Sequence, residues 1–152
     1  MRVTLSTTLR AMVACAAVTV CVALGGCSNS PTAPSAPTTL TMTDLVVGTG
    51  DAAVSGDALT TDFTGWLYDA TKPDFKGLQF QTSVGNTPLT FTLGAGQVIK
   101  GVEEGVTGMK VGGVRRLVVP ASLGYGNARN GPIPPNTALV FEIALTSLQS
   151  GS

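Results

Sequence analysis

The sequence predicts an α+β domain in which a curved antiparallel β-sheet wraps around one short α-helix. From residue 40 onward, short runs of alternating apolar and polar residues are separated by glycine and proline turns, a pattern typical of antiparallel sheets. Only the segment 98–109 places apolar residues at helical spacing. Its three glycines each lower helix stability by about 1 kcal/mol. We therefore expect this helix to form only when it is packed against the sheet.

Four segments carry the strand pattern, namely 58–68, 89–93, 114–119 and 138–148. In the first of them, the odd-numbered residues from Leu59 to Phe63 are expected on one face and their polar neighbours on the other. The third contains two adjacent arginines within an otherwise apolar run. The segment 68–80 has Pro73, Gly77 and charges of both signs, and is predicted to be a surface loop.

Composition excludes several classes of function. The chain has 152 residues, enough for one domain, and contains no histidine, so the commonest general base and metal ligand is missing. All three cysteines lie near the N-terminus, at Cys15, Cys21 and Cys27. The rest of the chain therefore predicts no zinc cluster, and no metal or cofactor is expected. Without Arg2 and Arg10 the chain has 7 basic against 9 acidic residues, a balance that predicts no nucleic-acid partner.

The first 27 residues are predicted to be an export signal. Arg2 and Arg10 precede the apolar run 11–24, which is too short for a comfortable transmembrane helix. The run ends in Leu24-Gly25-Gly26-Cys27, which resembles the bacterial lipobox, a motif whose cysteine is acylated and becomes the first residue of the mature protein. Cys27 is therefore the predicted lipidation site. Two or more acyl chains on it would anchor the protein stably to a membrane. An uncleaved N-terminal anchor and a signal peptide without lipid are the alternatives.

The predicted organisation has three parts. Residues 1–27 form the lipoprotein signal, and residues 28–39, SNSPTAPSAPTT, carry three prolines and no charge and form an extended disordered tether. Residues 40–152 form the folded domain. The expected location is the cell envelope, with the domain held by its lipid. Ser28 follows the cysteine where an aspartate would indicate inner-membrane retention, which favours an outer membrane facing the periplasm if the cell has one, and otherwise the outer face of the cytoplasmic membrane.

The folded domain resembles the FKBP family of macrolide-binding peptidyl-prolyl isomerases over about residues 40–148. The most informative stretch is 91–126, FTLGAGQVIKGVEEGVTGMKVGGVRRLVVPASLGYG. The family's motifs appear in order as DFTG (62–65), FQTS (80–83), LG followed by QVIKG (93–101), EEGV (103–106), MKVG (109–112), the loop PASLGYG (120–126), and IPPN followed by LVF (133–141). Each motif alone is weak, and their order makes the resemblance specific. It implies an FKBP-like fold and the isomerisation of Xaa–Pro bonds without covalent chemistry, metal or cofactor.

The resemblance also implies which residues form the site. The group implied to act in catalysis comprises Tyr125, Ile99, Phe141 and Phe80. Within it, the Ile99 backbone N–H and the Tyr125 hydroxyl would donate hydrogen bonds to carbonyls of the bound peptide. The other implied substrate-binding residues are Phe63, Gln81, Leu89, Gln97, Val98, Val102 and Ile133. Core packing alone is the alternative for the apolar members, above all Phe63 and Phe141. Tyr125 is expected to be exposed, because glycines flank it on both sides.

Several positions depart from the family's usual residues. Val102 stands where the pocket floor is usually a tryptophan or another large residue, Gln81 replaces the aspartate of the F-D-S-S motif, and Leu89 replaces a phenylalanine. Trp66 has the opposite strand parity from Phe63, so it is not expected to supply the missing floor. These changes predict a deeper or looser pocket with fewer polar contacts.

The expected function is therefore a prolyl isomerase that assists the folding of exported proteins. The implied partners are Xaa–Pro segments of unfolded or exported proteins, the membrane through the lipid anchor, and FK-type macrolides, and a monomer is expected. The alternative is a chaperone or adaptor that uses the same fold to bind proline-containing segments with weak turnover, which Val102 and Gln81 favour. A purely structural envelope lipoprotein is a third possibility.

Overall fold

The computed structural model describes residues 36–151. Six strands form one sheet in the order β1-β5-β6-β2-β3, with β4 also paired to β2, and every pairing between these strands is antiparallel. The elements in chain order are β1 (Thr41–Val46), β2 (Ala58–Tyr68), the 3-10 turn η1 (Pro73–Phe75), β3 (Lys76–Thr82), β4 (Leu89–Thr92), α1 (Lys100–Val106), β5 (Val114–Val119), the 3-10 turn η2 (Ala121–Leu123) and β6 (Leu139–Gln149). The predicted fold class is confirmed.

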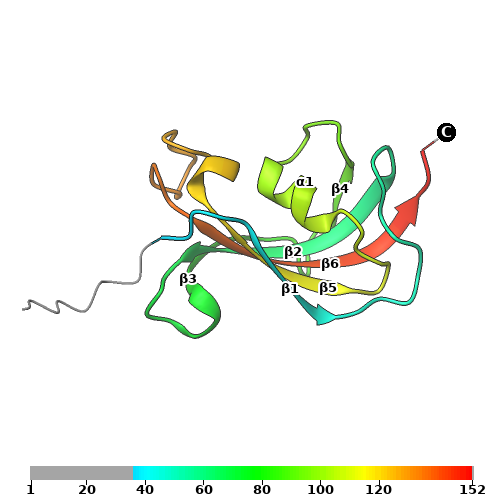
Figure 1. Cartoon of the computed structure of the whole chain (residues 1–152), viewed down its shortest axis with the longest axis horizontal. Helices are drawn as coiled ribbons and strands as arrows, with labels where there is room; N and C mark the ends of the chain where they lie inside the picture. Colours follow the sequence, from blue (N-terminus) through cyan, green and yellow to red (C-terminus); the bar gives the residue numbers. More distant parts are fainter. Residues whose placement is uncertain (1–35, 152) are drawn as a thin grey trace, which may run out of the picture. The chain divides into compact units, whose positions relative to one another are not determined.

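The helix α1 lies over one face of the sheet, which is called the inner face here (Figure 1). The inner face carries the alternating apolar residues that the strand patterns predicted. On β6, Leu139, Phe141 and Ile143 are all at most 5% exposed, and on β2 Leu59 is fully buried. Since alternate residues of a strand point to opposite faces, one face of each strand supplies the core.

Two glycines explain how α1 packs so closely on the sheet. A Cβ atom at Gly101 would collide with the Val119 side chain, and one at Gly105 would collide with the Leu117 side chain. The two glycines are one helical turn apart, so they share the face of α1 that meets β5. The residues that weaken the isolated helix therefore permit its tertiary packing, and Val102 and Val106 are buried beside them.

The helix is shorter than the pattern predicted. It spans Lys100–Val106 instead of 98–109, because Ile99 at its start and Thr107 at its end both have non-helical backbone angles. Gly108 then takes a positive φ of 72°, which a glycine tolerates without steric cost. Val98, Ile99 and Met109 still contact the core from these flanking turns, so their apolar spacing reflects burial outside the helix as well as within it.

The prediction of a loop over 68–80 is wrong in its second half. The structure has the turn η1 followed by β3, which begins at Lys76 and pairs with β2. The pairing is interrupted by register shifts on both sides of Trp66, so β3 does not show the regular alternation by which a strand is recognised. The first half, 69–75, is a turn closed by a hydrogen bond from the Asp69 N–H to the Phe75 carbonyl oxygen at 2.9 Å.

Within residues 36–151, no helix is long and apolar enough to cross a membrane. The predicted signal over 1–27, its Cys27, and most of the predicted tether over 28–39 lie outside the described residues. Their assignments therefore stay predictions.

Candidate functional site

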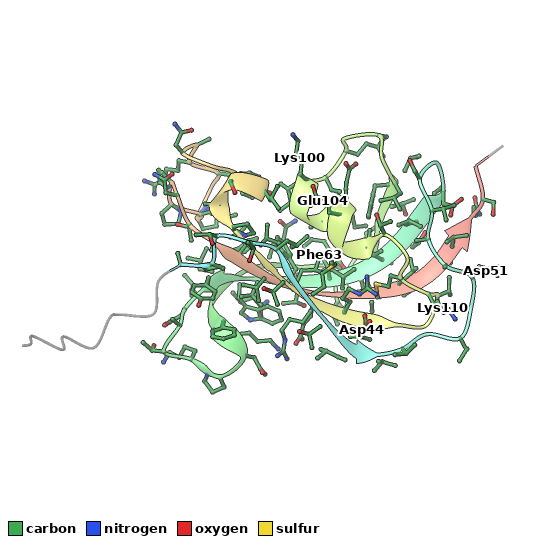
Figure 2. The ribbon with its side chains drawn as sticks, viewed as in Figure 1. Asp44, Asp51, Phe63, Lys100, Glu104 and Lys110 are labelled. Atoms are coloured by element: carbon green, nitrogen blue, oxygen red, sulfur yellow. The ribbon has the colours of Figure 1, made fainter. Side chains whose placement is uncertain are left out.

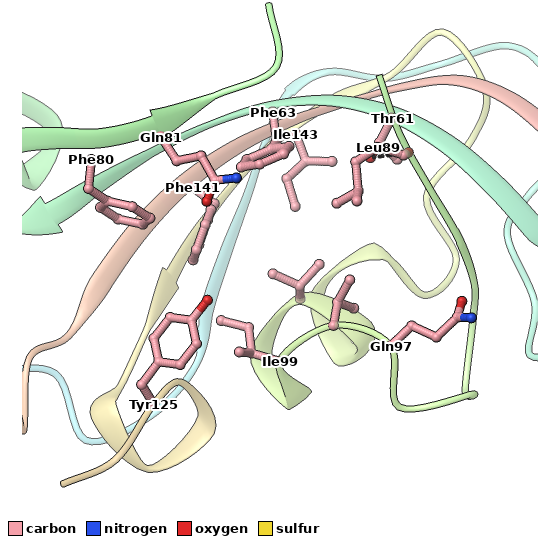
Figure 3. A pocket seen from close by; sticks show the side chains of 12 residues that line it. Thr61, Phe63, Phe80, Gln81, Leu89, Gln97, Ile99, Tyr125, Phe141 and Ile143 are labelled. Atoms are coloured by element: carbon pink, nitrogen blue, oxygen red, sulfur yellow. Dashed lines mark hydrogen bonds between the residues drawn. The ribbon is translucent and has the colours of Figure 1, made fainter. Parts of the chain in front are cut away.

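A cavity of about 320 Å³ opens between the inner face of the sheet and the start of α1 (Figure 3). Twelve residues line it, and they come from β2, β3, β4, the turn before α1, α1 itself, the loop after η2, and β6. They are Thr61, Phe63, Phe80, Gln81, Leu89, Gln97, Val98, Ile99, Val102, Tyr125, Phe141 and Ile143. None of the twelve is charged, so the cavity is a mainly apolar surface with a few polar groups at fixed positions.

A β-bulge directs two consecutive residues into this cavity. Phe80 and Gln81 are neighbours on β3 and would point to opposite faces of a regular strand. In the structure, Gly65 pairs with Gln81 while Trp66 pairs with Gln79, so Phe80 is an extra residue in the ladder. An extra residue re-aims the side chains beside it, and both Phe80 and Gln81 line the cavity.

The aromatic wall depends on a glycine in β2. A Cβ atom at Gly65 would lie 2.6 Å from Phe80 Cζ and 3.0 Å from Phe141 Cε1. Because Gly65 has no side chain, the two rings meet over it edge to face, with centroids 5.8 Å apart and planes at 89°. Phe63 completes the wall, 6.4 Å from Phe141 between centroids, and lies beneath α1 in Figure 2.

The opposite wall is the turn that leads into α1. The Gln97 side-chain oxygen accepts a hydrogen bond from the Thr92 N–H at 2.7 Å, and the Glu103 carboxylate accepts one from the Gly96 N–H at 2.8 Å. These two bonds fix the turn to β4 and to the helix. Ile99 is the N-cap residue that precedes α1, and its carbonyl oxygen accepts the first helical hydrogen bonds. Its own N–H has no acceptor among the residues that the structure describes.

Tyr125 closes the cavity from the loop after η2. Its side chain is half-buried, not exposed as the flanking glycines suggested. Figure 3 shows its hydroxyl directed into the cavity, between Ile99 and Phe141. The hydroxyl has no hydrogen-bond partner within the part of the chain that the structure describes, so it is free to bind a ligand there.

Ten of the eleven side chains that the sequence suggested for the site in the domain line the cavity, and Ile133 does not. Ile133 is 3% exposed in the core and pairs with Asn130 in an isolated bridge, so it supports the loop that follows Tyr125 instead of touching the cavity. Sequence reasoning missed Thr61 and Ile143. Each has the same strand parity as a residue that was chosen, Phe63 and Phe141 respectively, so alternation alone would have indicated them.

The groups whose pKa values are shifted lie outside the cavity. Asp44, Asp69, Arg116 and Glu142 are held by partners elsewhere in the domain, and none of them lines the cavity. Residues 36–151 contain no group of three or more histidine, cysteine or acidic residues placed to hold a metal ion. The arrangement can therefore bind an apolar group, and Ile99 and Tyr125 can donate hydrogen bonds to carbonyl oxygens next to that group.

Comparison with known proteins identifies this arrangement. The model of the family described as FKBP-type peptidyl-prolyl cis-trans isomerase matches residues 50–146. The chain belongs to this family. It is 46% identical to an FK506-binding protein of Neisseria meningitidis serogroup B over 108 residues, which cover 70% of this chain and 93% of the relative. It is 40% identical over 105 residues to FK506-binding protein 1 of Aspergillus oryzae, covering 66% of this chain and 90% of that protein.

Solved structures agree with this assignment. The crystal structure of AtFKBP13 matches with a TM-score of 0.63 and 33% identity, covering 75% of this chain and 96% of that one. The crystal structure of FkpA from Escherichia coli also matches with a TM-score of 0.63 and 33% identity, covering 74% of this chain and 49% of that one. This FKBP-type protein is a peptidyl-prolyl cis-trans isomerase, and proline-containing peptides are its general class of partner.

Proposed function

We propose that the cavity is the prolyl site and that the protein isomerises Xaa–Pro bonds of exported polypeptides while a lipid on Cys27 holds it at the membrane. The observation that carries the site assignment is the combination of an uncharged, largely apolar cavity with two unpartnered donors, the Ile99 N–H and the Tyr125 hydroxyl. A proline ring fits an apolar cavity, and the carbonyls next to it need donors.

The reaction asks for this kind of site because no bond is broken. Rotation about an Xaa–Pro amide crosses a barrier of roughly 18–20 kcal/mol, since resonance holds the amide planar. The planar amide is more dipolar than the twisted one, so water stabilises the ground state more than the transition state. An apolar cavity removes that water, and solvent exclusion lowers the barrier without any proton transfer.

The residues divide this work between them. The aromatic wall of Phe63, Phe80 and Phe141 holds the proline ring, while Val102 and Ile143 lie at the helix and sheet sides of the cavity. The carbonyl that rotates is gripped by a donor, for which Ile99 and Tyr125 are suited. A donor that binds the twisted carbonyl more strongly than the planar one stabilises the transition state selectively.

A peptide assay tests the site assignment. The chain from Ser28 onward is mixed with short Xaa–Pro peptides, and their cis-to-trans conversion is followed. Acceleration of the conversion that a proline-site ligand of the FK506 type abolishes is expected. An active protein whose Phe141→Ala and Tyr125→Phe variants both fold and keep full activity would show that the reaction takes place elsewhere.

The location is tested separately. The Leu24-Gly25-Gly26-Cys27 motif supports a lipid anchor, and the uncharged tether of residues 28–39 supports a domain that stands clear of the lipid surface. The wild-type protein should partition into detergent, and Cys27→Ser should leave an unprocessed or soluble form. Identical processing and fractionation of the two proteins would refute the anchor while leaving the isomerase assignment intact.

A second candidate use of the same cavity is to hold proline-containing segments with little turnover. The small side chain of Val102 at the cavity and the absence of a carboxylate at Gln81 favour it. In that case proline-containing peptides would bind measurably to the purified chain, while the isomerisation rate would rise only slightly above that of the uncatalysed reaction.

A further inference from the structure

The two strands that carry the rings of the edge-to-face aromatic pair are not adjacent in the sheet. Phe80 is on β3 and Phe141 is on β6, and β2 lies between these strands in the sheet. On the inner face the two rings meet over Gly65 of β2. The width of the cavity at this point therefore depends on how β3 is held relative to β6.

A second contact spans the same two strands on the outer face. Lys76 of β3 reaches over the Trp66 ring of β2, with its Nζ 4.5 Å from the ring centroid. The same Nζ lies 2.6 Å from Oε1 of Glu142 on β6. Glu142 is the residue next to Phe141, so the ion pair and the aromatic pair join the same strands on opposite faces of β2.

Two more charges complete this cluster. Arg116 of β5 donates to the same Glu142 oxygen at 2.9 Å through Nη2, and its Nη1 donates to Asp74 of η1 at 2.6 Å. The side chains of Lys76, Glu142 and Arg116 are between 17% and 25% exposed, while Asp74 is more open at 51%.

The turn before β3 has an unusual backbone and a stacked ring. Asp74 and Phe75 take positive φ values of 58° and 60°, and the Phe75 ring stacks on Tyr68 with centroids 5.3 Å apart. The turn before β3 is thus bound to the outer face by charge and by stacking.

Little else holds the beginning of β3. It is an edge strand whose ladder to β2 has four paired positions and two register shifts. Leu78 is 68% exposed and Gln79 is also exposed, so burial contributes little over this stretch. A weakly paired edge strand would let Phe80 move relative to Phe141 unless a contact outside the ladder restrained it.

We propose that Lys76 and Glu142 are positioning residues of the isomerase, which fix β3 against β6 on the outer face and thereby hold Phe80 in edge contact with Phe141 in the cavity. Neither residue touches the cavity. The ion pair acts through the backbone of β3 and β6, and Arg116 orients Glu142 from the other side. The inference rests on the cavity being the prolyl site, and its test includes a measurement that needs no activity.

The test compares two lysine variants of the same hairpin. Lys76→Met removes the charge but keeps an apolar stem over Trp66, whereas the control Lys72→Met removes an exposed lysine that forms no ion pair within the described residues. The protein is labelled with fluorinated phenylalanine, which gives one signal for each of its five phenylalanines. The Phe80 and Phe141 signals are assigned by single replacement of each residue.

In Lys76→Met the Phe80 and Phe141 signals should shift or broaden while that of Phe91, buried in the core away from the cavity, stays in place. KM for an Xaa–Pro peptide should rise between about three- and tenfold with kcat changed less, well below the roughly hundredfold that a 1 Å misplacement can cost. Glu142→Gln should have a similar effect, and the double variant should be no worse than either single variant, because both remove the same contact.

The ring signals separate this inference from the site assignment. Unchanged Phe80 and Phe141 signals in a folded Lys76→Met protein, or equal changes in Lys72→Met, would overturn the positioning role. Shifted ring signals with an unchanged KM would support the positioning role of the Lys76–Glu142 ion pair and count against the cavity as the prolyl site. Additive effects of Lys76→Met and Glu142→Gln on KM would also refute the proposal, since independent residues add.

Discussion

Arg115 of β5 donates a hydrogen bond through Nη1 to the carbonyl oxygen of Gly105, 2.8 Å away near the C-terminal end of α1. The same guanidinium reaches the Thr107 carbonyl oxygen and forms an ion pair with Asp44 of β1 at 2.5 Å. A cation at a helix C-terminus satisfies carbonyl groups that have no partner within the helix and interacts favourably with the helix dipole. Arg115 therefore joins β1, β5 and α1 on the inner face.

Replacing Arg115 should weaken the domain more than replacing an exposed arginine. Arg115→Met removes charge-assisted hydrogen bonds from a side chain that is only 14% exposed, so the free energy of unfolding should fall by about 1.5–3 kcal/mol. Arg129→Met, in an exposed loop, is the control and should change it by less than about 0.5 kcal/mol. Urea titration followed by Trp66 fluorescence measures both. Equal stability of the two variants would mean that Arg115 does not hold α1 in place.

The pH dependence of activity and of stability should differ. Because no histidine, carboxylate or lysine lines the cavity, kcat/KM for an Xaa–Pro peptide should be nearly flat from about pH 5.5 to 8.5. A steep change within that range would indicate proton transfer and contradict the proposed mechanism. The rates should be measured at a temperature well below unfolding, so that loss of fold does not enter the profile.

Stability, by contrast, should fall in acid. Partial burial raises the pKa of Glu142, but the hydrogen bonds from Lys76 and Arg116 outweigh it and hold that pKa below its ordinary value of 4.5. A carboxylate with a lowered folded-state pKa adds stability above its unfolded pKa and loses it as the pH falls through the folded one. Tm should therefore be constant above about pH 5 and should decrease as the pH falls below about 4.5. Glu142→Gln should have a smaller drop between the same pH values, and an identical drop would locate the acid sensitivity elsewhere.

Removing the Tyr125 hydroxyl should slow the reaction without abolishing it. Tyr125→Phe keeps the ring in the cavity and removes one neutral donor, which is worth on the order of 1 kcal/mol, so kcat/KM should fall several-fold. The hydroxyl has no partner in the described structure, so stability should be almost unchanged. Complete loss of activity in the folded variant would point to a chemical role for the hydroxyl that isomerisation does not require.

A larger side chain on the helix side of the cavity should increase kcat/KM or ligand affinity. Val102 lines the cavity and Val106, one helical turn further on, does not, although both are buried. Val102→Leu should place a larger side chain against the bound proline and raise kcat/KM or the affinity for an FK506-type ligand. Val106→Leu is the matched control, because it adds the same volume to a filled core and should only cost about 1–3 kcal/mol of stability. Unchanged kinetics in Val102→Leu would show that Val102 does not contact the substrate.

The sequence by itself determined the fold class, the parity of most strands and most of the cavity. Leu59, Thr61 and Phe63 alternate with polar residues, and this local pattern decides which face of β2 is buried whatever the rest of the chain does. The ordered motifs then identified the residues around the cavity. Thr61 and Ile143 were within reach of the same argument, since they share parity with Phe63 and Phe141.

Only the tertiary structure decided the features that depend on contacts between distant segments. The strand β3 is held by ion pairs from Lys76 and Asp74 to partners on other strands. The local sequence pattern does not contain these contacts, and by itself it predicts a loop. Ile133 lies in the core instead of the cavity because its loop folds back through a bridge to Asn130. The glycines of α1 lower its intrinsic stability, yet they are required where the helix meets Val119 and Leu117. Alternation and motif order are properties of neighbours in the chain, whereas close approach and charge pairing exist only once the strands are assembled.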